Sequence, residues 1–129
     1  MKSYLLLASL LGIYAFNFVY GQEDQNYIRI AKLIIDSGKV DDYKKAVKEH
    51  AEVAVSIEQG VIMLYAVSEK NRPTHFTVFE IYADKKAYDF HIRQPHFLKY
   101  KEAVKDMVEN LELIDVTPVA MKSKLRLPK

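Results

Sequence analysis

Residues 61–67 read Val-Ile-Met-Leu-Tyr-Ala-Val, and residues 75–82 read His-Phe-Thr-Val-Phe-Glu-Ile-Tyr. The first run is too short to be a convincing helix and carries no charge, so it predicts a strand that is buried on both faces. The polar segment Glu69–Pro73 separates the two runs and predicts a loop. Together the two runs predict a β-hairpin, around which the other elements can be placed.

A strand and a helix precede this hairpin. Residues 27–35 carry isoleucine and leucine on both alternating faces, which predicts a largely buried strand. In residues 40–57, apolar side chains recur every three or four positions and predict an amphipathic helix, with Asp41 and Asp42 favoured in its first turn. Gly60 is expected to stop this helix in the left-handed conformation, which costs glycine little.

Two helical segments and a strand follow the hairpin. Asp84 can cap a short helix through His91, and Pro95 interrupts that helix and starts another, expected to run through Met107. Residues 111–116 predict the last strand, and residues 122–129 predict a basic, solvated tail. The order strand, helix, strand, strand, helix, strand predicts one α+β domain of the ferredoxin-like βαββαβ type over residues 22–121.

This predicted fold has a consequence for assembly. Both helical regions of such a fold cover the same face of a four-stranded sheet, yet three of the four predicted strands are apolar on both faces. The other face would be a large exposed apolar patch, which soluble monomers avoid. We therefore expect a homodimer, in which a second copy covers that face and the two sheets pack into a dimeric α+β barrel.

The first 21 residues are typical of a secretory signal peptide. Lys2 is the only charged residue before Glu23, the stretch from Tyr4 to Tyr20 is almost entirely apolar, and the small residue Gly21 follows it. The alternative is a retained membrane anchor, because the apolar stretch is near the lower limit for a span. We expect cleavage, export to the periplasm or the exterior, and no membrane contact afterwards.

Composition and missing motifs exclude several classes of chemistry. The 129 residues contain no cysteine, which excludes thiol catalysis, disulfides and thiolate metal sites. There is no glycine-rich phosphate loop, Rossmann fingerprint or serine nucleophile elbow, so no cofactor is expected. The 19 basic and 17 acidic side chains are nearly balanced, and no basic-aromatic stripe is present, so nucleic acid is not an expected partner.

Two ionisable side chains are candidates for proton chemistry. Strand alternation puts Glu80 on one face with Val78 and Tyr82, where a carboxyl group is either desolvated, with a raised pKa, or neutralised by a donor. His91 lies on the apolar side of the following helix, so the two side chains could face one cavity and exchange protons with a ligand. The alternatives are a glutamate paired with a lysine and a hydrogen-bonded, half-buried histidine.

The remaining histidines carry weaker signals. His96 stands at a helix start, where a neutral imidazole is favoured, and both a pocket role and a surface role are open. His50 is interpreted as structural, and nothing supports a function for His75. A metal site made of Glu80, His91 and His96 is not expected, because the two histidines are five residues apart across a proline, not three or four apart on one helical face.

Several short pieces of the chain belong together as a pattern. They are Glu58-Gln59-Gly60-Val61, Tyr65, Phe79-Glu80-Ile81-Tyr82-Ala83-Asp84, Ala87, His91, Pro95, His96 and Phe97. Over residues 28–118 this pattern resembles the antibiotic biosynthesis monooxygenase family, although the family usually has Glu-Pro-Gly where this chain has Glu58-Gln59-Gly60. The resemblance implies a dimeric α+β barrel with one pocket per protomer between sheet and helices.

For the best-known members, the resemblance also implies insertion of oxygen into quinols or anthrones without metal or flavin. The protein deprotonates a phenol, and the electron-rich anion reacts directly with dioxygen, which requires a base, an apolar pocket and exclusion of water. Glu80 and His91 match the family's glutamate and histidine and would be the catalytic pair. The expected substrate-binding residues are His96, Tyr65, Tyr82 and Tyr88.

Other activities in the family suit this chain less well. Haem degradation uses a tryptophan, an asparagine in the first strand and a histidine in the last helix, whereas this chain has no tryptophan, no asparagine in Tyr27–Ile35 and Lys101 near that histidine's place. Isomerisation of phosphorylated sugars would rarely suit an exported protein. A non-catalytic dimeric module that binds a small ligand, and an isomerase or decarboxylase using the same His/Glu pair, remain open.

Overall fold

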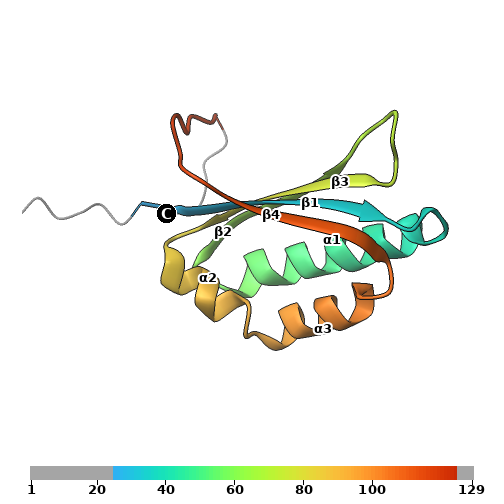
Figure 1. Ribbon diagram of the computed structural model, residues 1–129. Helices are drawn as coiled ribbons and strands as arrows, with labels where there is room; N and C mark the ends of the chain where they lie inside the picture. Colours follow the sequence, from blue (N-terminus) through green and yellow to red (C-terminus); the bar gives the residue numbers. More distant parts are fainter. Residues whose placement is uncertain (1–24, 125–129) are drawn as a thin grey trace, which may run out of the picture.

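The computed structural model describes residues 25–124, so the predicted leader over residues 1–21 lies outside the described residues. The described chain has the predicted α+β ferredoxin-like fold (Figure 1). Its elements are β1 (Tyr27–Ile35), a 3₁₀ turn η1 (Ser37–Lys39), α1 (Val40–Ile57), β2 (Val61–Ser68), β3 (His75–Tyr82), α2 (Lys85–His91), α3 (Pro95–Val104) and β4 (Val108–Val116).

The four strands form one antiparallel sheet in the order β2-β3-β1-β4, and all three α-helices lie on one face of it (Figure 1). The register places Arg29 opposite both Glu80 and Asp115 in one row across β3, β1 and β4. Two residues further along β1, Ala31 lies opposite Val78 and Leu113, and the next row on the same face joins Leu33 to Phe76 and Leu111. These three rows form the helix-facing surface that positions the site.

The core lies between this surface and α1. The apolar stripe predicted for α1 is the buried one, with Tyr43 and Ala54 completely enclosed and Val47 between them. Tyr43 packs edge-on against Phe76 of β3, with ring centroids 4.8 Å apart. Burying one large apolar side chain contributes roughly 1.5–3 kcal/mol to stability. The contact between Tyr43 and Phe76 therefore holds α1 against the sheet.

The helix boundaries follow local chemistry, with one difference from the predicted boundaries. Asp84 caps α2 as predicted, because its carboxylate accepts a hydrogen bond from the Ala87 N–H at 2.7 Å. Helix α3 ends at Val104, however, and does not reach Met107. The Met107 carbonyl instead accepts from the Asp36 N–H at 2.9 Å, because the chain already turns there to pair Val108 with β1.

Gly60 is needed for a different reason from the one predicted. No described glycine has a positive φ, and α1 ends at Ile57, just before Glu58, whose backbone is extended. A Cβ at residue 60, however, would lie 2.6 Å from the Cβ of Ala87. The start of β2 therefore passes so close to α2 that no side chain fits between them, and steric space, not a left-handed turn, selects glycine.

Within residues 25–124, no helix lies on the opposite face of the sheet (Figure 1). Tyr65 and Val67 of β2 point to this face and are 50% and 61% exposed, while Ile28 and Ile81 on the same face are buried. The segment that follows β4 lies on this side of the sheet (Figure 1). Among the described residues, no helix has the length and apolar character to cross a membrane.

Candidate functional site

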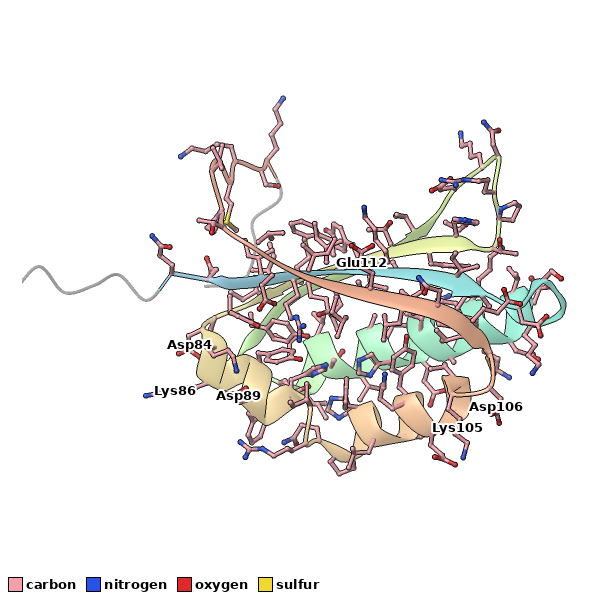
Figure 2. All side chains as sticks on the ribbon, viewed as in Figure 1. Asp84, Lys86, Asp89, Lys105, Asp106 and Glu112 are labelled. Atoms are coloured by element: carbon pink, nitrogen blue, oxygen red, sulfur yellow. The ribbon has the colours of Figure 1, made fainter. Side chains whose placement is uncertain are left out.

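A cavity of about 290 Å³ lies between the sheet and the helices. Side chains from the sheet, α1, α2 and α3 project into the layer that holds it (Figure 2). Its lining is mostly apolar or aromatic, and three of its polar members, Arg29, Glu80 and Tyr82, lie toward one end of the sheet. A few polar groups in an apolar hollow are the usual composition of a small-molecule site.

Glu80 is the acidic group in the described lining of this cavity. Desolvation by burial raises the pKa of its carboxyl group to about 7, while a hydrogen bond from the Tyr82 hydroxyl and the charges of Arg29 and Lys101 act in the opposite direction. The carboxyl group is therefore poised between its acid and its base forms near neutral pH. The strand alternation in the sequence placed Glu80 on this face with Tyr82, and the register agrees.

Tyrosine and arginine side chains surround Glu80. The Arg29 guanidinium donates a hydrogen bond to the Tyr88 hydroxyl, lies 4.8 Å from the centroid of the Tyr88 ring, and has its Nε 2.9 Å from the Asp115 carboxylate. Burial raises the pKa of Tyr82 above its ordinary value, so its hydroxyl remains protonated and can donate to Glu80. Arg29 thus supplies a fixed positive charge next to a group that exchanges protons.

A second ionisable cluster lies next to the cavity and was not predicted. Glu58, which directly follows α1, has its Oε2 2.6 Å from Nδ1 of His91 and 2.6 Å from Nε2 of His96. The Glu58 and His91 side chains are buried, and His96 is mostly buried. One carboxylate oxygen therefore accepts from two imidazoles and joins the ends of α1 and α2 to the start of α3.

Burial disfavours the charged forms of His91 and of the neighbouring His50. Burial lowers the pKa of His91, although the hydrogen bond and charge of Glu58 oppose the shift. Burial, followed by the charges of His91 and His96, lowers the pKa of His50 to about 4. The neutral His50 ring stacks on Tyr100, with centroids 4.6 Å apart and planes 11° apart. His50, which the sequence suggested to be structural, lines the cavity at this position.

The structure brings together only some of the predicted site residues. Glu80, Tyr82 and Tyr88 line the cavity. His91 does not line it, but its ring lies 5.4 Å from that of Tyr82, measured between centroids. His96 lines a separate groove between α1 and α3, in which His50 and Tyr100 also take part. Tyr65 lies on the opposite face of the sheet, away from the cavity.

The five-residue spacing of His91 and His96 was used as an argument against a metal site that includes Glu80. The break between α2 and α3 nevertheless lets both histidines reach one carboxylate, that of Glu58. Glu58 itself was noted only as part of a family pattern. The available signal was an acidic residue directly after an amphipathic helix, and that signal does not say which side chains will meet it.

Two histidines and one carboxylate also form a set that could hold a metal ion, since their ligand atoms lie within 4.8 Å of one another. Ligands of one ion at about 2.0–2.2 Å stand roughly 3 Å or more apart, whereas the two oxygen–nitrogen separations here are 2.6 Å. Those separations are typical of charge-assisted hydrogen bonds. The absence of a metal remains a prediction, which elemental analysis of protein purified without chelator would test.

Comparison with known proteins places this geometry in a family. The family model described as antibiotic biosynthesis monooxygenase matches residues 26–103. A solved structure from Bacteroides thetaiotaomicron, named as a candidate antibiotic biosynthesis monooxygenase, is 48% identical, with a TM-score of 0.76, and the match covers 81% of this chain and 99% of that one. A candidate from Nitrosomonas europaea is 21% identical over 73% of this chain and 99% of that one, with a TM-score of 0.69, and supports the fold alone. No curated protein matches the chain significantly.

Proposed function

The chain belongs to the antibiotic biosynthesis monooxygenase family, and we propose that it is a cofactor-independent monooxygenase that oxidises a quinol- or anthrone-like aromatic with dioxygen. The observation that supports this most directly is Glu80. A carboxyl group with a pKa of about 7 in an apolar, tyrosine-lined cavity of about 290 Å³ is suited to removing a proton from a weakly acidic aromatic.

The proposed reaction begins with this proton transfer. Glu80 accepts the proton of the substrate hydroxyl, and the resulting anion is rich enough in electrons to reduce dioxygen. A carbon–oxygen bond forms and leaves a peroxide on the substrate. For an anthrone, the methylene carbon loses two hydrogens and gains one oxygen atom. The oxygen–oxygen bond breaks, and the second oxygen leaves as water, so the substrate supplies all the electrons.

Neighbouring side chains would assist the proton transfer, but they would not take part in the exchange of atoms and electrons between substrate and dioxygen. Arg29 places a positive charge on the same side of the sheet as Glu80, where it would stabilise the substrate anion. The Tyr82 hydroxyl donates to Glu80 and favours its ionised form. His91, held by Glu58, packs against the Tyr82 ring and would keep it in place. We therefore assign His91 a positioning role, and Glu80 the role of base.

Oxygen uptake tests the proposal. The purified protein, with metals chelated, would be mixed with a panel of quinols and anthrones, and uptake compared with the autoxidation rate. We expect uptake above that rate, reduced at least tenfold in Glu80→Gln, because general-base catalysis typically contributes about 10²–10⁴ in rate. Glu112→Gln is the matched control, since Glu112 is exposed and lies opposite Lys32, away from the cavity.

Each negative outcome has a distinct meaning. Equal uptake by the Glu80→Gln variant and the wild type would show that Glu80 is not the base. If panel members raise the melting temperature without oxygen uptake, the protein binds aromatics but does not oxygenate them, because a ligand that binds the folded state stabilises it by mass action. Product formed without oxygen uptake would instead indicate an isomerase or decarboxylase.

A further inference from the structure

One face of α3 lines the cavity with a repeating set of side chains. Phe97, Lys101 and Lys105 are each four residues apart and all three line the cavity, Lys105 immediately after the end of the helix. Residues four apart lie on the same side of a helix, about 6 Å apart along its axis. Toward the C-terminal end of the helix, the cavity wall formed by α3 therefore gains the cationic side chains of Lys101 and Lys105, with Tyr100 and Val104 beside them.

The charges around the cavity are unequal. Three cationic residues, Arg29, Lys101 and Lys105, line it, against the single carboxyl group of Glu80, which is half neutral near pH 7. Arg29 is paired with Asp115, and Lys105 bonds to Glu102 at 2.5 Å. Within residues 25–124, the Lys101 ammonium has no hydrogen bond or ion pair. Lys101 is therefore the cationic side chain of this lining that remains available to an anionic ligand, and its charge also lowers the pKa of Glu80.

The cationic residues are distributed along the length of the cavity. Glu80 and Arg29 belong to one row of the sheet, whereas the far row joins Leu33 to Leu111, four residues further along β1. Four strand residues span about 13 Å. Lys105 lies at that far end, where α3 turns into β4, as its label in Figure 2 shows. A hydroxyl group that reacts at Glu80 is therefore too distant to meet Lys105.

We propose that the substrate is a phenolic aromatic acid, whose carboxylate is carried on the ring remote from the reactive hydroxyl and is bound by Lys101 and Lys105. This inference rests on the proposed function and names the class of its substrate. The apolar middle of the cavity, including Ala31 and Val78, accommodates the ring system. A neutral aromatic would contact the lysines only through their alkyl stems and leave both ammonium groups in water.

A matched pair of ligands tests the proposal. The probes are 1,4-dihydroxy-6-naphthoate, with its carboxylate on the ring away from the hydroxyls, and its neutral methyl ester. Binding to the full protein would be measured by calorimetry without oxygen, so that no turnover is needed. We expect the acid to bind about tenfold more tightly than the ester, because only the acid can form ion pairs with the two ammonium groups. The preference should shrink as salt is added.

Two double variants distinguish the effect of the two cavity lysines from the effect of a lower net charge. Lys101→Gln with Lys105→Gln should remove the preference for the acid over the ester. Lys99→Gln with Lys86→Gln removes the same charge, but Lys99 bonds to Glu49 at 2.6 Å and neither lysine lines the cavity, so the preference should persist. Melting curves would establish that both variants fold, as expected for exposed positions.

The outcomes also separate this inference from the proposed function. Equal binding of acid and ester by the wild type, a preference that survives in the cavity variant, or failure of both probes to bind would overturn the inference. An acid preference that disappears in the cavity variant, without oxygen uptake in air, would support the inference and contradict the oxygenation. Uptake with neutral quinols together with no acid preference would support the oxygenation alone.

Discussion

Glu58 and Glu80 are both buried carboxyl groups, but their surroundings differ. Glu58 accepts hydrogen bonds from two imidazoles, and its role is to hold three helix ends together. Glu80 has one donor, the Tyr82 hydroxyl, and desolvation is the largest influence on its pKa. One oxygen of the first carboxylate, Oε2, accepts from both imidazoles, whereas the second carboxyl group faces a cavity with a proton to exchange. The same residue type is therefore structural in one place and reactive in the other.

The raised pKa of Glu80 makes stability depend on pH in a defined direction. The folded protein holds this proton up to about pH 7, whereas the unfolded chain releases it near pH 4.5. Wild-type stability is therefore greatest below about pH 4.5 with respect to this group, and it decreases as the pH rises through 7. Glu80→Gln should avoid a loss of up to about 3 kcal/mol at pH 8.

Urea unfolding of the wild type and of Glu80→Gln at several pH values from 5 to 8 measures this effect. Groups that titrate in both proteins, such as His50 and His91, cancel in the difference. The variant's advantage should increase with pH across this range. A difference that stays constant from pH 5 to pH 8 would show that the Glu80 carboxyl group is not desolvated.

Replacing Glu58 should destabilise the protein, although Glu58 does not line the cavity. Glu58→Ala leaves two imidazole N–H groups without their acceptor, and each unsatisfied buried donor costs roughly 1–3 kcal/mol. We expect a loss of about 3 kcal/mol in Glu58→Ala and a smaller loss in Glu58→Gln, which keeps one acceptor. Glu52→Gln, an exposed position on α1, should change stability by less than about 0.5 kcal/mol. Equal losses in the Ala and Gln variants would contradict this account.

Different parts of the site were predictable to different degrees. Glu80 could be assigned to the cavity face from alternation alone, because a strand fixes side-chain direction within a few residues. The contact of Glu58 with His91 and His96 could not be predicted, because it depends on how the break between α2 and α3 folds back over the end of α1. The direction of the Tyr65 side chain could not be predicted either, because the run 61–67 is apolar throughout and does not show which sheet face each residue occupies. In the structure, Tyr65 lies on the face opposite the cavity.

At the scale of elements, the order and most boundaries were predictable, since apolar periodicity and caps are local signals. The end of α3 was not, because pairing with β1 draws residues 108–110 into β4, although they read neither as helix nor clearly as strand. The reason for Gly60 was also hidden, since it depends on a contact between β2 and α2. Both differences arise from packing between elements and not from intrinsic preference.

The contact between β2 and α2 can be tested by exchanging one methyl group. Gly60→Ala would bring two Cβ atoms to 2.6 Å, and we expect a loss of about 1–3 kcal/mol in the free energy of unfolding. Gly38→Ala is the control, because the nearest atom that its Cβ would meet, Oδ1 of Asp36, is at an ordinary 3.5 Å. Adding Ala87→Gly should restore most of the stability lost in Gly60→Ala. No rescue in this double variant would place the strain elsewhere.

For the whole molecule, the sheet face without helices leads us to propose a homodimer. Tyr65 and Val67 expose large apolar surface there, and their removal from water would favour association. Sedimentation equilibrium at micromolar concentration should give twice the chain mass, and replacing both residues with glutamate should give a monomer. Leu98→Glu, at an exposed position on α3, is the control and should remain dimeric. A wild-type monomer would contradict the proposal.

The reactive groups and the far end of the cavity lie in different rows of the sheet, so reactivity and the length of the accepted molecule can change independently in evolution. The row of Arg29 and Glu80 carries the reactive groups, and Leu33 and Leu111 of the far row bound the other end of the cavity. A side-chain change in the far row alters the length of molecule that fits, while the reactive row keeps its spacing because the strand backbone is unchanged. Descendants of one ancestor could therefore diversify in what they accept and conserve how they react.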